Sequence, residues 1–181
     1  MERNAVTSRL PIAQALIEKE VASEPYVQEV LRRLPPQCII TQAHHKAEEG
    51  RGAGSDPGKD ILHLMRYKGE FLKPCPGTRE YICCGYQILN IGTNCPLDCS
   101  YCILQSYFNE PNLRVFANIQ NELDRVLEVI DADPNRIFRI GTGEYTDSLA
   151  LDPVMCWSDF LLPAFSRRKN VILELKTKTD A

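Results

Sequence analysis

From residue 61 onward, short apolar runs alternate with amphipathic stretches, and this alternation limits the chain to a small number of folds. Short apolar runs suit buried strands, whereas apolar side chains at spacings of three and four suit helices that pack on them. Repeated β-α units of this kind form a parallel sheet. We expect strands at residues 86–91, 115–119, 136–140 and 171–175, with helices at 121–130 and 157–165.

The last predicted strand ends six residues before the end of the 181-residue sequence. A parallel β-α unit normally buries its final strand under a crossover helix, and no such helix follows in this sequence. We therefore expect the front part of a longer α/β fold.

The region before residue 85 has a different texture and predicts a small N-terminal α/β part over residues 1–84. Ser8 can cap a first helix that has Pro11 in its first turn, and Pro35 ends a second helix. We predict a helix over residues 8–19, a second helix from Ser23 to Leu34, a strand at 38–41 and a polar loop at 43–60.

Charge and hydropathy exclude several classes of protein. Twenty-one Lys and Arg against 24 Asp and Glu give a net charge of -3, which excludes a protein that holds nucleic acid by charge alone. No apolar run has the length of a membrane span, and the start MERNAVTSRL lacks the apolar core of a signal peptide. We expect a cytoplasmic protein that does not contact membranes.

The chain has eight cysteines, and in a reducing compartment their spacing points to metal or redox chemistry. Cys95, Cys99 and Cys102 form the C-x3-C-x2-C cluster of CPLDCSYC, directly after a predicted strand. Thiolates select zinc or iron–sulfur clusters, and three buried thiols without a metal are the plainer alternative. A closed zinc site needs a fourth ligand, for which Cys75 or the Cys83–Cys84 pair is available, and would indicate a zinc-binding, nucleic-acid-interacting module without catalysis.

With Tyr101 before its third cysteine, this motif resembles the C-x3-C-x-aromatic-C signature of the radical S-adenosylmethionine superfamily. The resemblance implies a partial or full TIM-type (β/α) barrel, here truncated, with residues 85–181 as its first part. It also implies an enzyme with a [4Fe-4S] cluster on Cys95, Cys99 and Cys102 that cleaves S-adenosyl-L-methionine to a 5'-deoxyadenosyl radical. Tyr101 would pack beside the adenine, and an external donor similar to flavodoxin or ferredoxin would supply the electron.

Two strand ends fit the same resemblance. Gly141, Gly143 and Glu144 follow a predicted strand and are similar to the superfamily's Gly-Gly-Glu element, which meets the methionine amino group. Lys178 follows the next strand and would hold the methionine carboxylate. The alternatives are an ordinary strand-end turn for the glycines and a solvated strand end for the lysine.

More narrowly, residues 92–118 resemble the spore photoproduct lyase branch of DNA-repair photolyase-like enzymes, with Glu144, Asp147 and Lys178 in register. This implies a carbon–carbon lyase with DNA as its substrate. Two positions depart from the lyase pattern: Ile103 stands where the lyases have a relay tyrosine, and Gly141 stands where they have a hydrogen-donating cysteine. The resemblance therefore implies the cofactor machinery more directly than repair of the thymine photoproduct.

Overall fold

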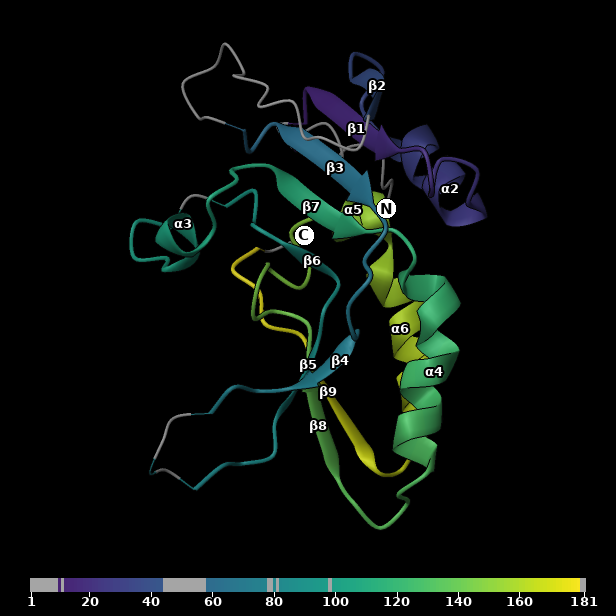
Figure 1. The fold of residues 1–181 in the computed structure, drawn as a ribbon, viewed down its shortest axis with the longest axis vertical. Coiled ribbons are helices and arrows are strands. Elements are labelled where there is room, and N and C mark those ends of the chain that lie inside the picture. The colour runs from purple at the N-terminus through teal and green to yellow at the C-terminus, as the bar shows by residue number, and fades with distance from the viewer. Residues whose placement is uncertain are drawn as a thin grey trace.

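The computed structural model describes residues 10, 12–43, 58–77, 80, 82–97 and 99–179, which form two open sheets with helices packed on them (Figure 1). The first sheet has the strand order β2-β1-β3-β7-β6 and the second the order β4-β5-β8-β9. Within the described residues the strands do not close into a barrel. The mixed α/β architecture with parallel sheets confirms the predicted fold class.

The first sheet is built from β1 (Gln14–Glu18), β2 (Ile39–Ala43), β3 (Ile61–Met65), β6 (Gly92–Thr93) and β7 (Leu113–Phe116). β1 runs parallel to both β2 and β3 and lies between them. The helix predicted over residues 8–19 is therefore wrong in its described part. Ala15 and Ile17 are buried while their neighbours are only half-buried, an alternation that suits a strand once two parallel partners are available.

The other N-terminal predictions fare better. α2 (Pro25–Arg33) confirms the second helix, with Val27 and Val30 buried and the chain turning extended at Leu34, before Pro35. β2 confirms the strand predicted at residues 38–41. Most of the polar loop predicted at 43–60, namely residues 44–57, lies outside the described residues, as do residues 8, 9 and 11 of the helix predicted over 8–19.

The second sheet and its helices match the sequence pattern closely. Its strands are β4 (Leu72–Pro74), β5 (Gln87–Leu89), β8 (Phe138–Gly141) and β9 (Val171–Glu174), and its helices are α4 (Ile119–Asp131), α5 (Asp152–Met155) and α6 (Trp157–Ser166). The strands predicted near residues 86–91, 136–140 and 171–175 are confirmed, as are both predicted helices. β5, β8 and β9 are parallel, so their carboxyl ends lie along one edge of the sheet.

Helices α4 and α6 lie side by side on the right of the view in Figure 1, against a core that includes the fully buried Trp157 and Ile130. Their far ends are joined by Arg168, whose guanidinium donates two hydrogen bonds to the Asp131 carboxylate at 2.7 and 2.6 Å. The Tyr26 hydroxyl donates to the Met155 carbonyl at 2.9 Å and ties α2 to α5. Among the described residues, no helix is both long and apolar enough to cross a membrane.

Strands are exchanged across the boundary predicted at residue 84. β4, from before it, pairs with β5 in the second sheet, and β7, from after it, pairs with β3 in the first. The division into residues 1–84 and 85–181 stays a prediction.

Candidate functional site

The three motif cysteines line a single cavity of about 590 Å³ together with residues from two strand ends. Of the residues predicted for the site, Cys95, Cys99, Cys102, Tyr101, Gly143 and Lys178 line this cavity. Asp147, which the resemblance placed in register, also lines it, as do Lys176 and Thr177 of the strand end that leads to Lys178. The sequence pattern did not single out the remaining lining residues, Leu97, Leu104, Thr146 and Leu175. Parallel strands explain the meeting, because the chain leaves the same edge of the second sheet after β5, β8 and β9. After β5 it passes through β6 of the first sheet into the loop that has the cysteines.

The cysteine loop, defined here as residues 94–97 and 99–102, is anchored at its start by Asn94. The Asn94 side-chain amide donates to the carbonyls of Glu110 at 2.7 Å and Asn112 at 2.9 Å, while its backbone adopts a φ of 66°. Just before it, a Cβ at Gly92 would lie 2.3 Å from the Arg114 carbonyl oxygen. Glycine at this position therefore allows β6 to approach β7.

The second half of the cysteine loop is a tight turn that leads into α3 (Leu104–Tyr107). The Cys102 amide donates to the Cys99 carbonyl at 2.9 Å, and the Gln105 side chain donates to the same oxygen at 3.0 Å. This turn places Cys99 and Cys102 on the same side of the cavity, with Tyr101 between them in the sequence.

Cys95 is the motif cysteine with the most distinctive surroundings. Its Sγ accepts a hydrogen bond from the Leu97 amide at 3.4 Å. Burial raises the pKa of the Cys95 thiol to about 11; the Asp147 carboxylate also raises it, whereas Lys59 favours the thiolate. Without a metal this thiol keeps its proton at neutral pH, and a bound cation would supply the charge that favours the thiolate.

The opposite side of the cavity is the strand-end segment, defined here as residues 142–148 and 175–178. Its centre is Asp147, which is 8% exposed. One carboxylate oxygen accepts from the amides of Leu149 (2.9 Å) and Ala150 (2.8 Å) and from the Thr177 hydroxyl (2.8 Å), and the other accepts from the Lys178 amide (2.7 Å). Asp147 thus joins the loop after β8 to the chain after β9.

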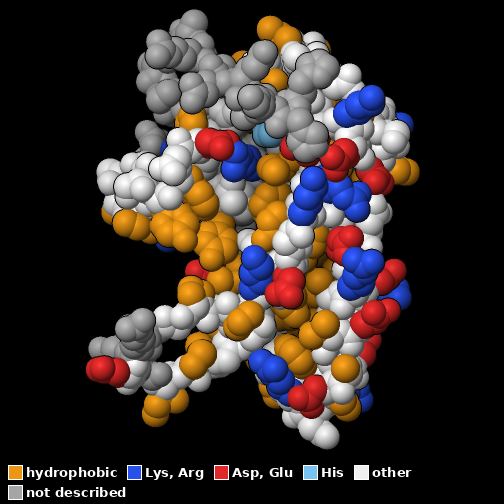
Figure 2. Space-filling view, viewed as in Figure 1, with side chains coloured by type: hydrophobic (Ala, Val, Ile, Leu, Met, Phe, Trp, Pro, Cys, Tyr) orange, Lys and Arg blue, Asp and Glu red, His pale blue; other side chains and the backbone are white. Residues whose placement is uncertain are grey.

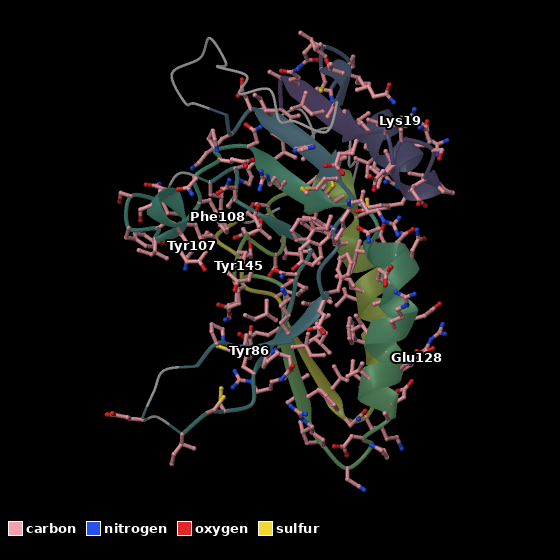
Figure 3. The ribbon with its side chains drawn as sticks, in the orientation of Figure 1. Lys19, Tyr86, Tyr107, Phe108, Glu128 and Tyr145 are labelled. Carbon is pink, nitrogen blue, oxygen red and sulfur yellow. The ribbon has the colours of Figure 1, made fainter. Side chains whose placement is uncertain are left out.

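The residues of the predicted glycine element occupy different places. Gly143 lines the cavity, and a Cβ there would lie 2.8 Å from the Lys176 Cβ and 2.9 Å from the Ser148 Oγ. Gly141 does not line it: a Cβ at Gly141 would lie 1.7 Å from the Tyr86 Oη, so glycine at this position admits the tyrosine ring. Figure 3 labels Tyr86 near the second sheet.

Glu144 does not line the cavity either, and its carboxylate accepts a hydrogen bond from the Lys176 ammonium at 2.5 Å. The same ammonium lies 4.6 Å from the centre of the Tyr86 ring. Burial by itself would lower the pKa of Lys176, but hydrogen bonds to Glu144 and Tyr86 outweigh it and raise the pKa. Lys176 is therefore a charged residue that lines the cavity and forms an ion pair with Glu144.

Thr146 is a cavity residue that no sequence pattern predicted. It is 3% exposed, and its hydroxyl finds no hydrogen-bond partner among the described residues. Because a buried hydroxyl without a partner is costly, this hydroxyl in the lining is available to a polar group of a ligand.

Aromatic side chains gather beside the cavity, where Tyr107 and Phe108 from the α3 region meet Tyr145 from the strand-end segment (Figure 3). The Tyr107 and Tyr145 rings are stacked with their centres 6.3 Å apart, and Phe108 packs edge-on against both. Tyr101 is 75% exposed. Figure 2 shows apolar side chains around a hollow on this side of the molecule.

The remaining cysteines considered as zinc ligands lie elsewhere. Cys83 and Cys84 are exposed and Cys75 is half-buried, on the segment that joins β4 to β5, and none of them lines the cavity. In the part of the chain that the structure describes, no three His, Cys, Asp or Glu side chains converge on a point that would hold a single metal ion. A closed zinc site is therefore not supported by this arrangement.

Comparison with protein-family profiles gave no match, and comparison with curated protein sequences gave none either. Solved structures did match. A spore photoproduct lyase variant with bound AdoMet and dinucleoside spore photoproduct aligns with a TM-score of 0.71 and 17% sequence identity, over 90% of this chain and 48% of that chain. The lyase complexed with dinucleoside spore photoproduct aligns with a TM-score of 0.70 and 17% identity over the same shares.

The chain thus has a partial form of the fold of radical S-adenosylmethionine enzymes, as the sequence predicted. Within that class, the fold is that of spore photoproduct lyase, and the chain spans about half the length of these neighbours. The identity of 17% makes this a statement about the fold.

Proposed function

We propose that this chain is a radical S-adenosylmethionine enzyme that holds a [4Fe-4S] cluster on Cys95, Cys99 and Cys102 and S-adenosyl-L-methionine in the adjoining cavity. The observation that carries the proposal is that these three cysteines, Gly143 and Lys178 line one cavity, although they come from three separate loops. The radical S-adenosylmethionine fold supports the same reading.

The donor set fits such a cluster. Three thiols in one loop leave a multi-iron cluster with an open coordination position, whereas a structural zinc site needs four ligands. The three cysteines line one cavity, so each thiolate could bind a different iron of one cluster. When bound, the cluster would supply the electron that cleaves S-adenosylmethionine to a 5'-deoxyadenosyl radical.

The chain's own residues would bind and orient the cofactor. Gly143 permits close approach of the backbone, and the cations Lys176 and Lys178 complement a carboxylate. Tyr101 offers a ring face for the adenine, and Glu144 would meet the methionine ammonium if Lys176 shifts from its present contact. Leu97, Leu104 and Leu175 supply apolar surface that keeps water from the reacting atoms.

For the substrate we propose a DNA photoproduct, with carbon–carbon lyase chemistry and an external electron donor similar to flavodoxin or ferredoxin. Two features support DNA. A spore photoproduct lyase of similar fold is complexed with dinucleoside spore photoproduct, and the stacked rings of Tyr107 and Tyr145 beside the cavity could stack against nucleic-acid bases. Ile103 and Gly141 supply neither a phenol nor a thiol, so the hydrogen donor would differ from that of the lyases. Conversion of the photoproduct back to two intact thymines within an oligonucleotide tests this proposal, and turnover of S-adenosylmethionine without repair would contradict it.

The test of the main proposal is anaerobic reconstitution with iron and sulfide, followed by an assay for 5'-deoxyadenosine from S-adenosylmethionine with dithionite. We expect a brown protein that forms 5'-deoxyadenosine. Cys99→Ala should abolish both, whereas Cys84→Ala, at an exposed cysteine outside the cavity, should abolish neither. A colourless protein that retains stoichiometric zinc would refute the proposal and favour the metal-binding module.

A further inference from the structure

We propose that Lys59, which lies outside the cysteine motif, is a positioning residue that holds the cysteine loop and raises the reduction potential of the cluster. This inference rests on the proposed function, because it concerns the cluster that the loop would bind. It adds to that function a source of redox control that neither the motif nor the fold identifies.

The geometry is a short relay through Leu97. The Lys59 ammonium donates a hydrogen bond to the Leu97 carbonyl at 3.0 Å, and the Leu97 amide donates to the Cys95 Sγ at 3.4 Å. Both backbone polar groups of Leu97 are thus engaged, one by the cation and the other by the first motif cysteine. The ammonium on the carbonyl thus restrains the residue whose amide points at the sulfur.

A glycine places Lys59 at this position. Gly58 has a φ of 95°, and a Cβ there would lie 2.6 Å from the Pro111 Cγ and 2.9 Å from the Asn112 Oδ1. The turn before β3 therefore packs directly against residues 111–112. Since the Asn112 carbonyl also accepts the hydrogen bond from Asn94, one loop fixes both Lys59 and the start of the cysteine loop.

The charge of Lys59 would act on Cys95, the same cluster ligand that its hydrogen bond to Leu97 helps to position. Its ammonium is linked to the Cys95 Sγ through one residue, because Leu97 accepts a hydrogen bond from Lys59 and donates one to the sulfur. Lys176 and Lys178 line the cavity from the strand-end segment. Lys59 approaches from the first sheet, on the side of the cysteine loop rather than the side of the strand ends.

A reduced cluster carries one more negative charge than an oxidised one, so a nearby cation stabilises the reduced form and raises the potential. The Leu97 amide acts in the same direction, because a hydrogen bond to a cluster sulfur also stabilises added negative charge. Removal of the Lys59 charge should disfavour one-electron reduction, on the order of tenfold in its equilibrium constant.

The experiment compares the midpoint potentials of the reconstituted wild type, Lys59→Gln and Lys59→Arg by redox titration followed by electron paramagnetic resonance, with iron and sulfide content measured in parallel. Lys68→Gln is the matched control, since Lys68 is exposed and contacts Glu20 at 3.9 Å away from the cavity. We expect a more negative potential for Lys59→Gln, a potential close to the wild type for Lys59→Arg, and no change for Lys68→Gln.

If Lys59→Gln does not fold, Lys59→Met, which keeps the aliphatic stem, takes its place. An unchanged potential in the neutral variants at equal iron content would overturn the role of Lys59 and leave the proposed function intact. Failure of the wild type itself to assemble a cluster would instead overturn the proposed function. A fall in potential that Lys59→Arg does not restore would also count against a role based on charge.

Discussion

The two sides of the cavity are built in different ways. The strand-end segment is held by its own polar groups: Asp147 accepts four hydrogen bonds, and the Ser148 hydroxyl accepts from the Thr142 hydroxyl at 2.8 Å and from the Lys176 amide at 3.0 Å. The cysteine loop is instead anchored at points along it, by Asn94, Lys59 and Gln105. The strand-end segment is therefore organised before any ligand binds, whereas the cysteine loop has thiols whose natural partner is a metal.

The largest effect should come from breaking the organised side. Asp147→Ala leaves the Thr177 hydroxyl and three backbone amides without their acceptor, in a place that water reaches poorly. We expect a loss of about 3 kcal/mol or more in the free energy of unfolding. Asp147→Asn keeps one acceptor oxygen and should lose less. Urea denaturation followed by circular dichroism measures both, and equal midpoints for Asp147→Ala and the wild type would show that the strand ends do not depend on this carboxylate.

The next effect should appear on the other side when the cluster is loaded. Because metal binding to thiolates couples to local folding, amides of the cysteine loop should exchange hydrogen about 10- to 100-fold more slowly in the reconstituted protein than after chelation of its iron. Amides of residues 148–150 and 176–178 should change little. Hydrogen exchange read by mass spectrometry separates the two segments, and equal protection of both would contradict the asymmetry.

Sequence patterns predicted the second sheet well and the first sheet less well, for a physical reason. α4 and α6 have apolar side chains at helical spacing, and β8 and β9 are short apolar runs between turns, so local signals are sufficient. β1 has apolar residues at spacings that suit either a helix or a strand. Its state is decided by parallel pairing with β2 and β3, which are distant in sequence, and no local pattern contains that information.

The site residues also fall into those that a local sequence signal identifies and those that only the fold identifies. The motif spacing identified Cys95, Cys99 and Cys102, which line the cavity, because metal ligands in one loop are a local signal. Thr146 and Lys59 carry no such signal: a threonine in a turn and a lysine before a strand are ordinary residues until the fold brings them to the cavity and to Leu97.

A smaller effect should come from Thr146, a cavity residue of the organised side whose buried hydroxyl has no partner among the described residues. Thr146→Val removes the hydroxyl and keeps the shape. If the hydroxyl bonds the ligand, affinity for S-adenosylmethionine should fall about tenfold with no loss of stability. Thr146→Ser should bind like the wild type. Equilibrium dialysis with the reconstituted protein measures this, and unchanged affinity in the valine variant would remove Thr146 from the binding site.

The smallest effect should be a dependence of the strand ends on acid. A hydrogen bond from Arg139, helped by the Lys176 charge, lowers the pKa of Glu174 at the end of β9. A carboxyl whose pKa is lower in the folded state contributes stability above its ordinary value near 4.5 and loses it as the pH falls through the folded value. Because this group is partly exposed, the loss should be below about 1 kcal/mol.

Glu174→Gln should remove this acid-dependent loss, and it should also flatten the acid side of the pH profile for S-adenosylmethionine binding, because Glu174 contacts the cavity residue Lys176. Asp131→Asn is the control: hydrogen bonds from Arg168 lower the pKa of Asp131 in the same way, but this pair joins the far ends of α4 and α6. It should change the acid stability profile and leave the binding profile as in the wild type. Identical binding profiles for both variants would mean that the strand-end charges stabilise the fold but do not affect binding of S-adenosylmethionine in the cavity.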